Sequence, residues 1–110
     1  MRLASDNLGP FEFQLLAVLL EQPRDAYGVT IMQRVEARTG KSRSLAAIYA
    51  TLDRLQQKGL VSSWWGEPTV ERGGRRKRFY KIEASGEQAV IRTRIAVEPR
   101  IVAAPVGAGA

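Results

Sequence analysis

The side chains with the clearest chemical character in this sequence are cationic, and they cluster in one short segment. Between Glu71 and Lys81 the chain has six lysines and arginines and one acidic residue. The whole chain carries a net charge of +6, so the remainder is close to neutral. The six cations are Arg72, Arg75, Arg76, Lys77, Arg78 and Lys81. Positive charge concentrated in this way is typical of a surface that binds a polyanion such as nucleic acid.

The composition excludes several kinds of catalytic site. The 110 residues contain no cysteine and no histidine, which excludes disulfides, thiolate nucleophiles, histidine general bases and zinc sites built on these side chains. The sequence has no cluster of carboxylates and no phosphate-binding glycine loop, and Gly73-Gly74 indicates only a turn. It therefore predicts a binding protein without a cofactor or metal ion, and not an enzyme.

A helix is predicted from Ser44 to Lys58, just before the basic segment. Its apolar residues recur at helical spacing and form one stripe, made of Leu45, Ile48, Leu52 and Leu55. Ser44 is a suitable N-cap, and Gly59 is a suitable stop. The opposite side carries mainly small and cationic residues, namely Arg43, Ala46, Ala47, Ala50, Arg54 and Gln57. Small side chains would let this helix enter the major groove of DNA, although alanine is also simply the best helix former.

Two strands are predicted after this helix, with the basic loop between them. Residues 60–65 and 78–82 are rich in the β-branched and aromatic side chains that strands favour. Helix, strand, basic loop and strand is the layout of a winged helix-turn-helix, in which a hairpin forms the wing. We therefore predict a mainly α fold with a small β-hairpin wing, in the order α-α-α-β-β-α.

The predicted strands contain two pairs of adjacent aromatic residues, Trp64 with Trp65 and Phe79 with Tyr80. Adjacent residues of a strand face opposite sides. One member of each pair should therefore belong to the core. The exposed member could stack on a partner, a ligand or a second subunit.

Three further helices are predicted. The first, over residues 10–21, has proline in its first turn and is apolar on nearly every side. Such a helix either runs through the middle of the fold or is partly buried against a second subunit, and we favour the second subunit. The next helix, over residues 26–38, has Asp25 as its N-cap, and Gly28 within it indicates close packing of two helices. The last helix, over residues 84–97, is weakly amphipathic and suited to pairing with another helix.

The length allows one compact domain. We expect residues 1–9 to be a flexible lead-in, 10–83 to form a winged helix-turn-helix DNA-binding domain, 84–97 to be a C-terminal dimerisation helix, and 98–110 to be a disordered tail. The longest apolar run, Leu15 to Leu20, has six residues. Such a run is too short to cross a membrane or to act as a signal peptide. We therefore expect a cytoplasmic protein that does not associate with membranes.

In their order and spacing, these segments resemble the PadR-like winged-helix transcriptional regulators over about residues 8–92. The matching stretches are Phe11 to Leu20, Ala26-Tyr27-Gly28-Val29, Ser44 to Val61, Glu71-Arg72-Gly73-Gly74-Arg75, and Phe79-Tyr80-Lys81-Ile82 followed by Gly86. The resemblance implies a dimeric, repressor-type regulator. Its third helix enters the major groove, its wing contacts the backbone or minor groove, and its last helix crosses to the other subunit. Many members also bind a small hydrophobic effector at the dimer interface.

Two features of the sequence depart from the family pattern. Position 83 is Glu where the family commonly has a Thr that caps the last helix, so we expect that helix to start at Ser85. The sequence also ends soon after this helix, so dimerisation would rest on the first and last helices. The residues expected to take part are Phe11, Leu15, Val90 and Val97.

The predicted DNA-binding residues lie on the third helix and the wing: Arg43, Ser44, Ala46, Ala47, Tyr49, Ala50, Arg54, Arg75, Arg76, Lys77 and Arg78. The helix arginines can donate paired hydrogen bonds to guanine or phosphate, and the wing cations would neutralise phosphates. Tyr49 could donate its hydroxyl to a phosphate or be half-buried against the wing. The expected partner is duplex DNA in the protein's own or a neighbouring promoter. The alternatives are an RNA-binding module or a protein-interaction module that uses Trp64 or Trp65.

Overall fold

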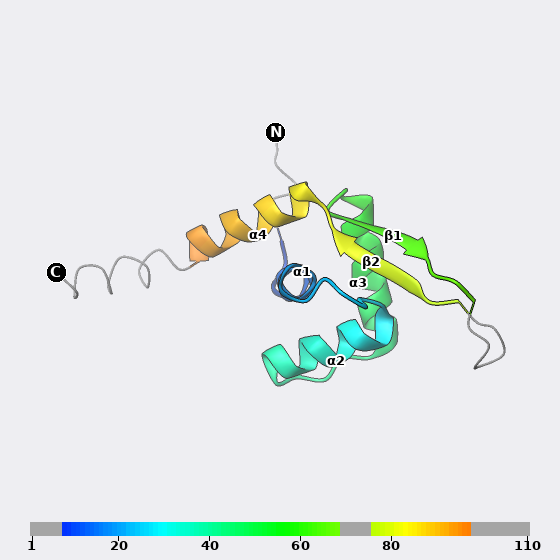
Figure 1. Cartoon of the computed structure of the whole chain (residues 1–110). Coiled ribbons are helices and arrows are strands. Elements are labelled where there is room, and N and C mark those ends of the chain that lie inside the picture. Colours follow the sequence, from blue (N-terminus) through cyan, green and yellow to red (C-terminus); the bar gives the residue numbers. More distant parts are fainter. Residues whose placement is uncertain (1–7, 69–75, 98–110) are drawn as a thin grey trace.

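The computed structural model describes residues 8–68 and 76–97. Arg72 and Arg75, residues 1–7 of the predicted lead-in and the whole predicted tail lie outside these residues. The described residues form four helices and one antiparallel strand pair: α1 (Pro10–Glu21), α2 (Gly28–Thr39), α3 (Leu45–Gln57), β1 (Val61–Trp65), β2 (Arg78–Ile82) and α4 (Ala84–Val97). This order is the predicted winged helix-turn-helix (Figure 1). No helix in this part of the chain is long and apolar enough to cross a membrane.

Helix α1 runs through the middle of the fold. Figure 1 looks down its axis, and α2, α3, α4 and β2 all contact it. The residues from Leu15 to Leu19 are buried, and Leu15 itself is 0% exposed. Our expectation that Leu15 contacts a second subunit is therefore wrong, because other elements of the same chain cover it. Val90 of α4 is also 0% exposed, so it has no surface to offer a partner either.

Helix α2 begins later than predicted. Tyr27 is its N-cap residue, and the Tyr27 N–H donates to Thr30 Oγ1 at 3.0 Å. Asp25, the predicted cap, lies before it in the left-handed region with a φ of 53°. The Ala26 carbonyl accepts the N–H of Tyr80 at 2.8 Å. Because this hydrogen bond pairs it with the hairpin, Ala26 belongs to the sheet side of the fold and not to the helix.

The hairpin is attached to the start of α2. Its two strands pair antiparallel, with Trp64 opposite Phe79. Tyr27 forms a further antiparallel bridge with Phe79, next to the hydrogen bond from Tyr80 to Ala26. These backbone contacts determine where the wing stands relative to the helices.

The aromatic residues of the hairpin are not distributed as predicted. Tyr80 belongs to the core, as expected for one member of its pair, and only 5% of its surface is exposed. Trp64 and Trp65, however, are 47% and 57% exposed, so neither is a core residue. Both tryptophans lie at the end of β1, and the outer end of the hairpin extends beyond the helices (Figure 1).

Helix α4 begins at Ala84, before the predicted start at Ser85. The Glu83 N–H donates to the Leu60 carbonyl at 2.9 Å, and the Glu83 carbonyl accepts the N–H of Glu87 at 2.9 Å. The backbone contact with Leu60 thus holds the first turn of the helix in place. The glutamate at position 83 does not delay the helix.

Candidate nucleic-acid interface

Helix α3 is held at both ends by the residues that the sequence indicated. Ser44 Oγ accepts the Ala47 N–H at 3.0 Å, which makes Ser44 the N-cap. Gly59 follows the helix with a φ of 78°, a conformation that favours glycine. The buried side is the predicted stripe, with 0% exposure at Ile48, Leu52 and Leu55. This orientation leaves Ala46 and Ala50 exposed, as predicted for a helix that approaches another surface.

An open groove of about 640 Å³ lies between α3, the start of α2 and the hairpin. Predicted DNA-binding residues from two separate segments line it, namely Tyr49 and Ala50 of α3 with Arg76, Lys77 and Arg78 of the wing. Among the described residues that line it, Asp53 is the only acid. The fold therefore joins the exposed side of α3 and the wing in one concave, positively charged surface.

Two other predicted DNA-binding residues point away from this groove and contact the first turn of α1. The guanidinium carbon of Arg43 lies 4.4 Å from the centre of the Phe11 ring. Phe11, a predicted dimerisation residue, is thereby half-buried under an arginine of its own chain. Arg54 Nε lies 3.6 Å from a carboxylate oxygen of Glu12, and its Nη2 donates to Thr51 Oγ1 at 3.2 Å. Both arginines are exposed, but neither lines the groove.

Glu12 holds α1 and α3 together, a role that we did not predict from the sequence. Its side chain is only 10% exposed and accepts two hydrogen bonds from Lys58 Nζ, at 3.0 and 3.1 Å, as well as one from the Gly9 N–H at 3.0 Å. Burial would raise the pKa of this carboxyl, but the hydrogen bonds from Gly9 and Lys58 and the charges of Lys58 and Arg54 lower it below its usual value. The contact joins the C-terminal end of α3 to α1 and so orients the groove-facing helix. The feature of the sequence that could have indicated this role is an acidic residue near the start of a helix that is otherwise almost entirely apolar.

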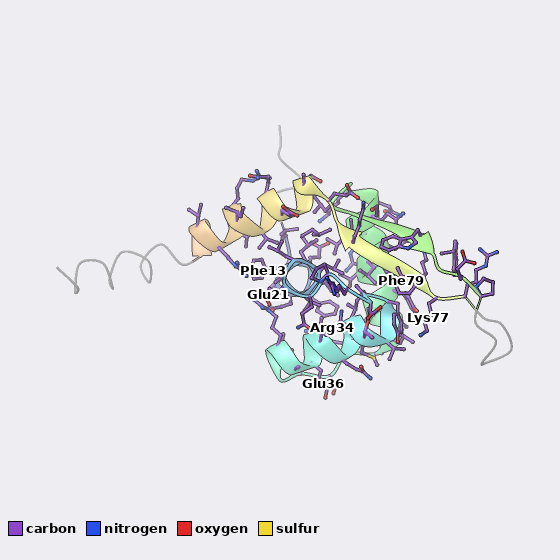
Figure 2. All side chains as sticks on the ribbon, in the orientation of Figure 1. Phe13, Glu21, Arg34, Glu36, Lys77 and Phe79 are labelled. Atoms are coloured by element: carbon purple, nitrogen blue, oxygen red, sulfur yellow. The ribbon has the colours of Figure 1, made fainter. Side chains whose placement is uncertain are left out.

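A row of aromatic side chains joins the wing to α2. We did not predict this contact from the sequence. The rings of Tyr27 and Phe79 meet edge to face at 5.6 Å between centroids, and Trp64 stacks on Phe79 at 5.8 Å. Lys77 Nζ lies 4.4 Å from the centre of the Tyr27 ring. Figure 2 shows Lys77 and Phe79 on the hairpin beside the start of α2. The position of the basic wing therefore depends on Tyr27, a residue outside the wing.

Tyr49 packs against the start of α2. A Cβ atom built on Gly28 would lie 2.3 Å from the Tyr49 hydroxyl oxygen, so only glycine leaves room for this ring. The sequence prediction that Gly28 marks a close approach of two helices is confirmed. Tyr49 is nevertheless 42% exposed, and its ring forms part of the groove wall.

We expect Gly28→Ala to displace the Tyr49 ring without unfolding the protein. The ring can move because it is partly exposed, and alanine is favoured over glycine in helices by about 1 kcal/mol. The free energy of unfolding, measured with urea, should therefore change by less than about 1 kcal/mol. DNA affinity should fall about 3- to 10-fold, the range for one lost polar contact. In a Tyr49→Ala background the same glycine substitution should leave affinity unchanged, and a further loss there would contradict this explanation.

Comparison with known proteins agrees with the observed fold. The sequence profile of the transcriptional regulator PadR-like family matches residues 15–92. RosR of H. salinarum is 28% identical, with 88% of this chain and 80% of that chain covered and a TM-score of 0.68. A PadR family transcription regulator from Clostridium difficile is 20% identical, with 86% and 99% covered and a TM-score of 0.62. A PadR-like transcription factor from Bacteroides fragilis is 21% identical, with 91% and 89% covered and a TM-score of 0.66. No curated protein sequence matches significantly.

The family match covers well over half of the sequence and includes α2, α3, both strands and most of α1 and α4. It also contains all the residues that form the groove. The chain therefore belongs to the PadR-like family of transcriptional regulators, which are DNA-binding proteins and not enzymes.

Proposed function

We propose that the protein is a dimeric, sequence-specific repressor that binds duplex DNA in its own or a neighbouring promoter. The observation that carries this proposal is the groove in which the exposed side of α3 meets the cations of the wing. A major groove is wide enough for α3, and the wing would then reach the flanking backbone or minor groove. Occupation of promoter DNA by such a dimer would exclude the transcription machinery.

The proposal assigns different tasks to the two elements. The small side chains on α3, those of Ala46, Ala47 and Ala50, let the helix approach the bases and contact thymine methyl groups. Ser44 and Tyr49 lie beside them. The cations contact phosphates, which determines affinity and register but carries no sequence information. They are Arg43 and Arg54 beside α3 and Arg75, Arg76, Lys77 and Arg78 of the wing.

We propose that the dimer forms through α4 and the first turn of α1. Ile91 and Ile95 lie one turn apart on α4 and are 46% and 64% exposed, which is unusual for isoleucine in a monomer. A second hollow, of about 380 Å³, lies between α1 and α4 and is lined by Leu8 and Phe13 among others. A second subunit would cover these apolar surfaces, and a small hydrophobic effector could bind there. Val97 is assigned to the same interface from the sequence alone.

The decisive test is a fluorescence-anisotropy titration of the promoter fragment upstream of the protein's own gene, with a scrambled duplex and a matching RNA, across a salt series. We expect tight binding to the promoter alone, with two chains per site. The triple variant Arg76→Gln, Lys77→Gln and Arg78→Gln should bind all duplexes more weakly. Its slope of log K against log salt should be shallower by roughly 5, since three cations are removed from each of the two chains and each phosphate contact contributes about 0.9.

The matched control is Lys81→Gln, because Lys81 lies on the same strand but on the face opposite Arg78. Its salt slope should equal that of the wild-type chain. Equal binding to promoter, scrambled duplex and RNA would contradict a sequence-specific regulator and leave a non-specific electrostatic surface. A complex with one chain per site would contradict the dimer.

A further inference from the structure

A chain of hydrogen bonds connects α3 to the wing through Ser63. The Arg78 Nε–H donates to Ser63 Oγ at 3.0 Å, and Ser63 Oγ donates to Gln56 Oε1 of α3 at 3.0 Å. Within the described residues, the two terminal nitrogens of Arg78 have no hydrogen-bond partner. The guanidinium is therefore tethered on one side, and its remaining donors are available to a ligand in the groove.

Two aromatic rings flank the same guanidinium. Its carbon lies 5.5 Å from the Trp65 ring centre and 5.8 Å from the Tyr80 ring centre. Tyr80 is buried, and burial raises the pKa of its hydroxyl, although the charge of Arg78 partly opposes this effect. Trp65 is different, since 57% of its surface is exposed and it forms part of the groove wall. Arg78 and Trp65 thus lie side by side in the absence of a ligand. The arginine is held by a hydrogen bond, and the indole ring beside it is largely exposed.

The two tryptophans of β1 have opposite surroundings. Trp64 lies on the other face of the hairpin, where it stacks on Phe79. Trp65 instead faces the surface that contains Tyr49 and Ala50 of α3. An exposed tryptophan beside a tethered arginine suits a partner that presents an apolar surface next to an anion. A DNA strand does so at every nucleotide, where a deoxyribose adjoins a phosphate.

We propose that Trp65 is a DNA-contacting residue whose indole packs against a sugar of the strand that passes between α3 and the wing. Arg78 donates to the adjacent phosphate, and Ser63 and Gln56 are positioning residues that hold Arg78 in place. The proposal rests on the proposed function, namely that α3 and the wing bind duplex DNA together. Three cations, Arg76, Lys77 and Arg78, line the groove against one carboxylate, Asp53, among the residues that the structure describes, which favours an anionic occupant.

The first test compares Trp65→Ala with Trp64→Ala, the same substitution at the neighbouring position on the opposite face. Trp65→Ala should weaken binding to the promoter duplex about 10-fold, as expected for loss of one aromatic contact with a nucleotide. Its salt slope should stay that of the wild-type chain, because no charge is removed. Arg78→Gln, by contrast, should reduce the slope by about 2, because the arginine is lost from both chains of the dimer. If Trp64→Ala weakens binding as much as Trp65→Ala, the proposal is wrong.

A spectroscopic test reports on Trp65 directly, without loss of the contact. Trp64→Phe leaves Trp65 as the only tryptophan, and its fluorescence should change on titration with the duplex and become less accessible to iodide. Trp65→Phe leaves only Trp64, whose emission should stay constant. Unchanged Trp65 emission at saturating DNA would overturn the proposal while leaving the proposed function intact. If the wild-type chain binds no duplex at all, the proposed function fails as well.

The positioning role of Ser63 can be tested separately, by measuring the DNA affinity and the melting temperature of Ser63 variants. Ser63→Ala should weaken duplex binding about threefold, the effect of one net hydrogen bond, with an unchanged melting temperature. Ser63→Thr keeps the hydroxyl and should restore the affinity. An equal loss of affinity in both variants would show that the hydroxyl does not position Arg78.

Discussion

Replacing Gly86 with alanine is expected to destabilise the protein by about 3 kcal/mol, with a melting temperature roughly 15 °C lower. A Cβ atom at this position would lie 2.4 Å from the Leu60 carbonyl oxygen and 2.7 Å from Ile82 Cγ1. The carbonyl belongs to the backbone that holds the first turn of α4, so it cannot rotate away as a side chain can. We therefore expect α4 to shift from the core, and thermal unfolding followed by circular dichroism measures the effect.

The control for this prediction is Gly40→Ala. Gly40 has a φ of 76°, and a Cβ atom there would meet nothing within 4 Å, so this substitution introduces backbone strain but no clash. Gly40→Ala should lower the free energy of unfolding by about 1 kcal/mol. Alanine is intrinsically better than glycine within a helix, so if Gly86→Ala melted at or above the wild-type temperature, the tight contact with Leu60 would have no energetic importance.

The second large effect is expected for Glu12→Gln, which should reduce the free energy of unfolding by about 2 kcal/mol at neutral pH. The carboxylate is nearly buried and is shared by Lys58 and Arg54. Removal of its charge leaves these two cations without their anion. The matched control is Glu21→Gln, because Glu21 also pairs with two cations but its side chain is 43% exposed. Such surface pairs contribute about 0–1 kcal/mol.

The same carboxyl predicts how stability depends on pH. Its pKa is lower in the folded chain than the ordinary value of 4.5, so the unfolded chain takes up this proton first as the pH falls. The stabilisation is complete above the ordinary value and is lost as the pH falls through the lowered pKa. Urea unfolding of the wild type should therefore show a loss of stability in acid that is smaller in Glu12→Gln. Parallel curves for the two proteins would contradict the assigned role of Glu12.

Much of the local structure could be predicted because its causes lie close together in the sequence. Leu45, Ile48, Leu52 and Leu55 share a face of any helix that contains them. Ser44 can cap that helix through an amide three residues away. The strands differ from their predicted bounds only at Leu60. The candidate DNA-binding residues were found by the same means, since exposed alanines and clustered cations are visible as a pattern.

The errors concern residues whose surroundings depend on distant segments. Leu15 was assigned to a dimer interface because the sequence cannot say which apolar face its own chain will cover. Asp25 was assigned as a cap because the competing hydrogen bond to Ala26 comes from β2. One of Trp64 and Trp65 was expected to be a core residue, but both are exposed, at the end of a hairpin that extends beyond the helices.

The sequence by itself determined the order of the helices and strands and which side of α3 is buried, and its clustered cations indicated an anionic partner. Only the tertiary structure decided that Glu12 meets Lys58, that Tyr27 supports the wing, and that Ser63 joins Gln56 to Arg78. The physical reason is that periodicity and capping act over three or four residues. Contacts between separate elements depend instead on how the whole chain packs around α1.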